Sequence, residues 1–226
     1  MNNSLNNHIL KALPEQEYQR LKSYLVPIQL SLNEILVRPD RKNKMLYFPT
    51  QGIVSLMSVM QDGYTTQVGV VGREGMVGTL QFLGEAPSNC QYIVRVQGWA
   101  MAIEQEVLQR EFHQVKMLQK LLLGYALKLF NQVSQCAACN SHHSVRQRIA
   151  RWLLMLDDRC DEDILLMTQQ LFSQMLGVRR TGITEVAKKL QQQKIINYHR
   201  GKIEIIDREA LEMVACECYQ LLKDRS

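Results

Sequence analysis

One segment, Gln169–Lys189, constrains the fold of this chain more than any other feature. Its sequence is QQLFSQMLGVRRTGITEVAKK. Gly177 stands where a tight turn needs a residue that accepts a positive φ, and the small Ser173 stands where two crossing helices would touch. Apolar residues on both sides of the glycine have the spacing of two short helices that pack through one face each. They are Phe172, Leu176, Val178, Ile183 and Val186. The pattern predicts a helix-turn-helix.

The outward face of the second predicted helix is polar and basic. Its residues are Arg179, Arg180, Thr181, Thr184, Glu185, Lys188 and Lys189. A face of this chemistry suits the base edges and phosphates of a DNA major groove. An ordinary helical hairpin with a solvated basic face has the same pattern, so the flanking sequence must decide between the two interpretations.

The downstream flank predicts a two-stranded wing. Two β-rich runs, Ile195–Tyr198 and Lys202–Ile206, bracket three turn residues, His199, Arg200 and Gly201. Arg200 and Lys202 at the wing tip are placed to contact phosphates. Residues 173–202 carry seven Lys or Arg against the single acid Glu185, a balance of 7 − 1 = +6, whereas the whole chain has +5. This concentration of charge favours a polyanionic partner.

The region from about Asn33 to Ile103 is rich in strand signals. The expected strands are Glu34–Val37, Leu46–Pro49, Ile53–Met60, Tyr64–Val71, Tyr92–Gln97 and Trp99–Ile103. Asp62-Gly63 predicts a hairpin turn, and we expect the last two strands to pair with each other. Many short strands with frequent turns are typical of a sandwich, a barrel or a jelly roll.

A long helical stretch opens at Glu104. Residues along it recur at alternating steps of three and four: Val115, Leu118, Leu122, Tyr125, Leu129, Gln132, Cys136 and Cys139. This repeat is that of a coiled-coil seam and predicts a homodimer about a two-fold axis. The alternative is that the stripe packs on the chain's own β domain. A polar hinge at Asn140–Ser144 would precede a helix over Val145–Leu156.

Two further helix starts are predicted in the C-terminal part. Thr168 is a plausible N-cap for the first helix of the helix-turn-helix, and Asp207 for a last helix through about Leu222.

The composition excludes several classes of protein. The chain of 226 residues is 46% hydrophobic and 22% charged, which is typical of a globular protein. It has no apolar run of 18 residues and no signal peptide, so we expect a cytoplasmic protein that does not enter a membrane. GREGMVG lacks the Gly-Lys-Ser/Thr ending of a phosphate-binding Walker loop, and no nucleophile–base pair is evident, so we expect no enzyme.

The cysteines suggest a metal cluster only weakly. They are Cys90, Cys136, Cys139, Cys160, Cys216 and Cys218. Cys136-x-x-Cys139 is followed by His142 and His143, but this spacing matches no common structural zinc pattern. Small residues that fill a seam near the hinge are the simpler explanation of this spacing, and a metal or redox site is the alternative. We therefore expect no metal and no cofactor, and we expect Cys216 and Cys218 to be ordinary packing or surface residues.

The chain resembles the Crp/Fnr family of bacterial transcription regulators, most strongly over MTQQLFSQMLGVRRTGITEVAKKLQ and the wing RGKIEIID. The resemblance implies a cyclic-nucleotide-binding-type β-roll, a dimerisation helix, a DNA-reading C-terminal domain and RNA polymerase as a further partner. Arg180 matches an arginine that contacts guanine in well-known members. Thr181 and Glu185 replace a glutamate and an arginine of the family pattern, so a different operator is expected.

The ligand pocket departs further from the family pattern. Cyclic-nucleotide binders of the family carry a Phe-Gly-Glu-like turn, whose glutamate binds the ribose, and an Arg-Ser/Thr-Ala, whose arginine binds the cyclic phosphate. Here the turn is Val77-Gly78-Thr79, and the later position falls near Cys90-Gln91-Tyr92. A phosphate buried without a cation is unfavourable, so cyclic AMP is not expected, unless Arg73 or Arg95 supplies the charge.

Taken together, the sequence predicts an α+β protein with an N-terminal jelly-roll-like β-barrel, a long dimerisation helix and a C-terminal winged helix-turn-helix. The expected domains are residues 1–112, 113–143 and 144–226. The expected function is that of a homodimeric, sequence-specific DNA-binding transcription regulator that responds to an unidentified small molecule and binds a pseudo-palindromic operator of double-stranded DNA. The alternative is a ligand- or redox-sensing module that acts mainly on protein partners.

Overall fold

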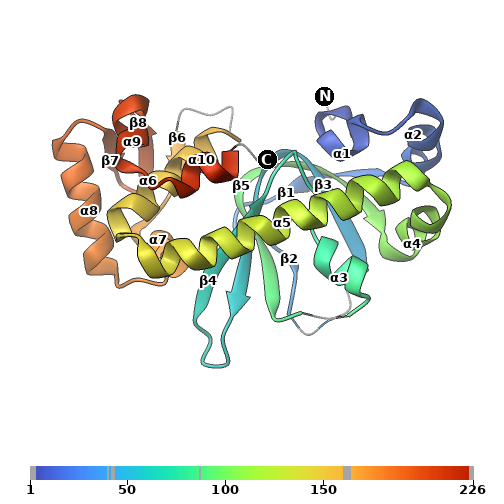
Figure 1. Ribbon diagram of the computed structural model, residues 1–226, viewed down its shortest axis with the longest axis horizontal. Coiled ribbons are helices and arrows are strands. Elements are labelled where there is room, and N and C mark those ends of the chain that lie inside the picture. The colour runs from blue at the N-terminus through green and yellow to red at the C-terminus, as the bar shows by residue number, and fades with distance from the viewer. Residues whose placement is uncertain (1–3, 40, 42–43, 87, 160–163, 224–226) are drawn as a thin grey trace. The chain divides into compact units, whose positions relative to one another are not determined.

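The computed structural model describes residues 4–39, 41, 44–86, 88–159 and 164–223 (Figure 1). The chain divides into two units, one of Met1–Val59 with Gly69–Asn131 and one of Met60–Val68 with Gln132–Ser226. The predicted boundaries near residues 112 and 143 stay a prediction. The long helix α5 (Lys116–His142) runs from the first unit into the second.

The first unit is built on an antiparallel sheet, as the strand signals predicted. The strands of this sheet are β1 (Val26–Leu30), β2 (Ile35–Val37), β3 (Met45–Val59), β4 (Thr65–Val71) and β5 (Cys90–Glu104). The first half of β4, up to Val68, is assigned to the second unit. Their order is β1-β5-β3-β4, and β2 also pairs with β5. The mixed fold is confirmed, but the predicted barrel is wrong in one respect, because in the described residues the sheet is not closed on itself.

Two of the strands are longer than the sequence indicated. The predicted strands Leu46–Pro49 and Ile53–Met60 fall along β3, which ends at Val59. The two that were expected to pair with each other, Tyr92–Gln97 and Trp99–Ile103, both belong to β5, which pairs along β3 instead.

Glycines explain why these strands continue. Gly52 has φ 89°, and a Cβ at Gly98 would lie 2.3 Å from the Gln51 carbonyl oxygen. The ladder shifts register between Pro49 and Val54. The glycines therefore let the paired strands bend and approach closely, where the sequence pattern indicated that they end.

Several helices precede, connect and follow the strands of this sheet. They are the 3-10 turn Ser4–Asn6, α1 (His8–Lys11), α2 (Glu15–Lys22), α3 (Thr79–Gly84), α4 (Gln105–Gln114) and the first part of α5. The predicted continuous helix from Glu104 is interrupted at Val115, whose backbone is extended. A Cβ at Gly75 would meet the ring of Tyr125 on α5 at 2.1 Å, so this glycine turn lies directly against the helix.

Two opposite faces of α5 are apolar. The predicted seam from Val115 to Cys139 is buried within the chain at every apolar position. Its residues up to Leu129 lie in the first unit, as the alternative interpretation had it, whereas Cys136 and Cys139 lie in the second. A second stripe, Leu123, Leu127 and Phe130, is 52, 62 and 64% exposed. At 3.6 residues per turn the two stripes lie roughly 150° apart around the helix.

The second unit consists of helices and a small sheet. Its elements after α5 are α6 (Val145–Asp157), β6 (Ile164–Leu166), α7 (Gln169–Leu176), α8 (Arg180–Gln192), β7 (Ile196–His199), β8 (Lys202–Ile205), α9 (Arg208–Val214) and α10 (Cys218–Lys223). The sheet has the order β6-β8-β7, so the predicted wing gains a third strand. Ser144 caps α6 in a capping box with Gln147. The predicted hinge Asn140–Ser144 is too long, because residues 140–142 still belong to α5. Trp152 packs edge-on against Phe172 in the core.

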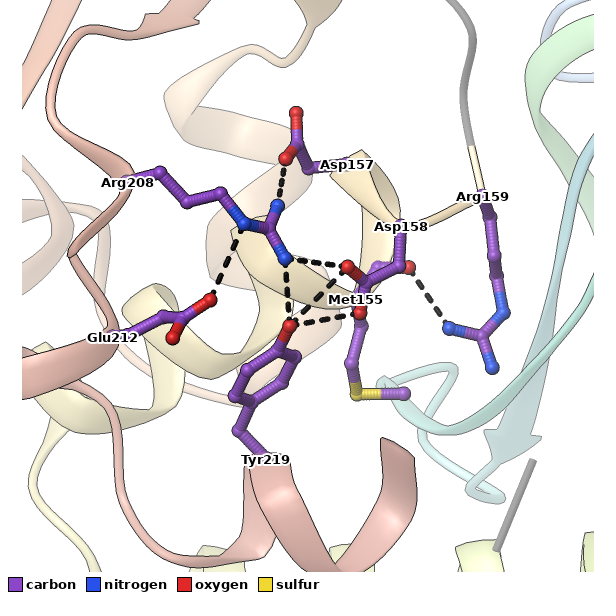
Figure 2. A network of polar contacts seen from close by, with 7 residues as sticks. All are labelled: Met155, Asp157, Asp158, Arg159, Arg208, Glu212 and Tyr219. Carbon is purple, nitrogen blue, oxygen red and sulfur yellow. Dashed lines mark hydrogen bonds and ion pairs between the residues drawn. The ribbon is translucent and has the colours of Figure 1, made fainter. Parts of the chain in front are cut away.

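The last predicted helix is broken. Asp207 caps α9 through the Ala210 amide, as expected, but the helix ends at Val214, and Ala215 is extended. Arg208 at the start of α9 holds the broken segment in place (Figure 2). It contacts Asp157 and Asp158 at the end of α6 and the Tyr219 hydroxyl on α10, the latter at 2.8 Å. The two short helices are thereby tied to α6.

In the part of the chain that the structure describes, no helix combines the length and the hydrophobicity that a membrane crossing requires.

Candidate nucleic-acid interface

The helix-turn-helix is present where the sequence predicted it. Gly177 ends α7 in the left-handed region, with φ 62°, which glycine adopts without strain. The Ser173 hydroxyl donates to the Val178 carbonyl at 2.6 Å and fixes the turn. Thr168 caps α7 by accepting from the Leu171 amide at 3.1 Å, as predicted. These local bonds set the direction in which α8 leaves the turn.

The inner and outer faces of α8 are sharply different. Ile183, Ala187 and Leu190 are buried on one side. All nine residues predicted to face DNA are exposed: Arg179, Arg180, Thr181, Thr184, Glu185, Lys188, Lys189, Arg200 and Lys202. The core therefore holds the helix through its apolar face and leaves the basic face open to a partner.

Gln169 at the start of α7 orients two of these residues, and sequence reasoning missed it. Its side-chain oxygen accepts from the Thr184 hydroxyl at 2.9 Å and from Arg180 Nε at 3.4 Å. Arg180 and Thr184 lie one turn apart on α8, so one amide positions both. The only signal in the sequence was a glutamine next to the Thr168 cap, which does not reveal a contact to the following helix.

The wing turns tightly beside α8. Arg200 and Gly201 both have positive φ, 47° and 78°, as the two-residue hairpin turn of type I′ requires. His199, which was expected in the turn, instead ends β7 and pairs with Lys202. The Gln191 side chain on α8 accepts from the Tyr198 amide at 3.0 Å. The wing is thus attached to the helix whose basic face it extends.

Comparison with protein families assigns both regions of the chain. A Crp-like helix-turn-helix domain matches residues 147–214, and a cyclic nucleotide-binding domain matches residues 27–114. The chain belongs to the Crp/Fnr family. Members of the Crp/Fnr family are transcription regulators, and the chain is a DNA-binding regulator of this type with a cyclic-nucleotide-binding-type domain.

Solved structures share the fold of this Crp/Fnr protein. FixK2 from Bradyrhizobium japonicum has a TM-score of 0.71 at 14% identity, over 85% of this chain and 98% of the other. The c-di-GMP responsive global regulator CLP from Xanthomonas campestris has 0.69 at 19%, over 85 and 99%. A CRP/FNR family regulator from Thermus thermophilus has 0.64 at 16%, over 84 and 98%. A comparison with curated proteins finds no match.

The position of the Crp/Fnr ribose-binding carboxylate is occupied differently here. Thr79 is fully buried, and its hydroxyl donates to the Met76 carbonyl at 2.7 Å. Arg95, one of the two arginines considered for a phosphate, is 6% exposed and donates to the Asn33 side chain at 3.0 Å. Burial lowers the pKa of Arg95 to about 10. Both side chains thus contribute to the packing of the first unit.

Proposed function

We propose that this Crp/Fnr protein acts as a homodimer that reads a pseudo-palindromic DNA operator, with one α8 in the major groove of each half-site. The observation that carries the proposal is the face of α8, on which every residue predicted to contact DNA is exposed above a buried apolar side. Two-fold symmetry then requires half-sites about one helical turn apart.

The exposed residues have chemically distinct tasks in this proposal. Arg180 reads a guanine through two hydrogen bonds, and Glu185 accepts from a cytosine amino group. Thr181 and Thr184 add further base readout. The residues that hold phosphates are Arg179, Lys188, Lys189, Arg200 and Lys202.

The proposed dimer interface is the outward stripe of α5. Leu123, Leu127 and Phe130 follow one another at steps of four and three, which is the spacing of a helix that packs against a second copy of itself. The small residues Ser134 and Ala137 continue the same exposed stripe. Gly124 beside it has open space at its Cβ position, which permits a close approach of the partner helix.

The first unit is proposed to sense an effector other than a 3′,5′-cyclic nucleotide. Thr79 offers no carboxylate to a ribose. A hollow of about 320 Å³ lies elsewhere in this unit, between α3 and α4, with Gln81, Gln109 and Arg110 in its lining; this volume suits a small ligand. We expect the protein to act in the cytoplasm, with RNA polymerase as the partner through which DNA binding changes transcription.

Selection of bound duplexes from a random pool tests the proposal. Purified protein should enrich an inverted repeat whose half-sites are centred about 10 base pairs apart. Enrichment of a single half-site would contradict the dimer, and the absence of enrichment at low salt would contradict sequence-specific reading and favour a module that acts on protein partners.

A further inference from the structure

Four side chains in the second unit bring metal-binding atoms together outside the DNA-facing surface. They are Cys139 near the end of α5, His143 just after it, Cys216 between α9 and α10, and Cys218 at the start of α10. One sulfur or ring nitrogen from each lies within 4.8 Å of all the others. Three thiols and one imidazole form the Cys₃His donor set of structural zinc sites.

The shortest distances between the donor atoms agree with tetrahedral coordination of a metal ion. Cys139 Sγ lies 3.5 Å from Cys216 Sγ, and Cys218 Sγ lies 3.5 Å from His143 Nδ1. Zinc bonds of about 2.3 Å to sulfur and about 2.0 Å to nitrogen give edges of about 3.5–3.8 Å between ligands in a tetrahedron. The remaining pairs of donor atoms lie within 4.8 Å of each other, at most about 1 Å more than these edges.

The sulfur atoms are shielded from solvent. Cys139, Cys216 and Cys218 are 0, 4 and 0% exposed and form a cluster of their own. Thiols are weak hydrogen-bonding groups, so three of them gain little from one another in a core.

Neighbouring polar side chains contact His143 and Cys218 in the way that polar residues around a metal site contact its ligands. His143 Nε2 lies 3.2 Å from a carboxylate oxygen of Glu217, so that its other nitrogen, Nδ1, is directed to Cys218. Carboxylates bind the outer nitrogen of metal-ligating histidines in the same way. Gln135 donates its side-chain amide to Cys218 Sγ at 3.0 Å, so this sulfur has a polar partner besides the cluster itself.

A buried cation balances the charge of such a site. Arg151 is 3% exposed, and in the described part of the chain its hydrogen bonds go to the sulfur atoms of Cys136 and Met155. A buried guanidinium without an anion is strongly unfavourable. One divalent ion with three thiolates has a net charge of 2 − 3 = −1, which offsets the charge of Arg151.

The break between α9 and α10 explains how the cluster forms and why the sequence pattern did not predict it. In a continuous helix, residues two apart point in nearly opposite directions. The extended Ala215 ends α9, and both Cys216 and Cys218 then reach Cys139. The Arg208 contacts hold Tyr219, next to Cys218, against α6 (Figure 2). The expectation of ordinary packing or surface positions for Cys216 and Cys218 is therefore corrected: both are buried beside other metal-binding groups.

The cluster differs from the one that the Cys136-x-x-Cys139 spacing suggested. Cys139 and His143 belong to it, whereas Cys136 contacts Arg151 and His142 is exposed. Cys160 lies outside the described residues. Cys90 is a half-buried thiol of the first unit.

We propose that Cys139, His143, Cys216 and Cys218 bind one Zn²⁺ ion, which fastens the C-terminal segment to the end of α5. The site does not depend on DNA or on an effector.

Metal analysis of the full chain, purified without chelators, tests the proposal. We expect about one zinc per chain, and Co²⁺ in its place should give the intense visible bands of a tetrahedral thiolate site. Cys216→Ser and His143→Ala should lose the zinc and these bands. The matched controls, Cys90→Ser and His142→Ala, should retain both.

Two further measurements separate a zinc site from a reduced thiol cluster. Glu217→Gln should weaken zinc binding about tenfold while the protein stays folded. Removal of zinc by a chelator should speed amide hydrogen exchange in residues 218–223. The proposal is overturned if the reduced wild-type protein binds neither Zn²⁺ nor Co²⁺, if iron occupies the site instead, or if His143→Ala and His142→Ala retain equal zinc.

Discussion

The N-terminal sheet unit and the C-terminal winged unit place their polar groups in opposite ways. In the first unit, Thr79 and Arg95 are buried and donate hydrogen bonds to other residues of the same unit. Both were considered as positions for a ligand contact in the family pattern. In the second, Arg180 and Lys188 are exposed on a helix whose other face is buried. Both units match a family by fold, yet Thr79 and Arg95 are enclosed by the first unit, whereas the basic residues of α8 are exposed on the second. A shared fold therefore does not establish a shared ligand.

The largest effect is expected at α5, the helix that both units share. Leu127→Glu should weaken self-association at least about 100-fold, because burial of a leucine contributes about 1.5–3 kcal/mol and the residue occurs twice in a symmetric dimer. Sedimentation equilibrium measures this change. Lys128→Glu, at an exposed position off the stripe, is the control and should leave the dimer intact; equal behaviour of the two variants would place the interface elsewhere.

The next effect concerns how the winged unit reads DNA. Arg180→Ala should reduce operator affinity by about 1–3 kcal/mol and relax the preference at one base position. Lys188→Ala should instead weaken all sequences alike and lower the salt slope by about one. Fluorescence anisotropy with matched and mismatched duplexes at several salt concentrations distinguishes them. If Arg180→Ala keeps full discrimination, another residue reads that base.

A smaller effect is expected from the residue that positions Arg180. Gln169→Ala removes the acceptor shared by Arg180 and Thr184 and should reduce operator affinity by about 0.5–1.5 kcal/mol. The loss should be greater on the operator than on random DNA, because the phosphate-facing lysines are untouched. Gln170→Ala, next to it on α7, is the control. A uniform loss on all duplexes would mean that Gln169 only stabilises the fold.

The smallest effect is expected in the sheet unit. Titration calorimetry with cyclic AMP and cyclic GMP should detect no binding, and neither nucleotide should raise the melting temperature. A ligand present at 100 times its dissociation constant would stabilise the protein by about 2.7 kcal/mol, so binding would be easily seen. A clear shift would contradict the proposal that the effector is not a cyclic nucleotide.

Local signals were sufficient to predict most of the winged unit. Each of these features depends on a few adjacent residues alone, and the structure confirms each of them: the positive φ at Gly177, the caps at Thr168 and Asp207, and the glycine turn in the wing. The exposed basic face followed from the 3.6-residue period of α8.

Features that depend on distant contacts were missed. The closeness of Gly98 to Gln51 lets β5 continue where a strand end was expected. The stripe from Val115 to Cys139 has a dimer-like period, but periodicity does not say which surface covers a stripe. Cys139 and Cys216 are far apart in sequence, and only the break after α9 brings them together.

The absence of a side chain at Gly75 has a mechanical consequence. Since the Tyr125 ring occupies the space that a methyl group would need there, the loop after β4 has no room to move closer to the middle of α5 unless the ring gives way. A push on that loop toward α5 therefore presses on the tyrosine, and through it on the helix that carries Leu123, Leu127 and Phe130 on its outward side.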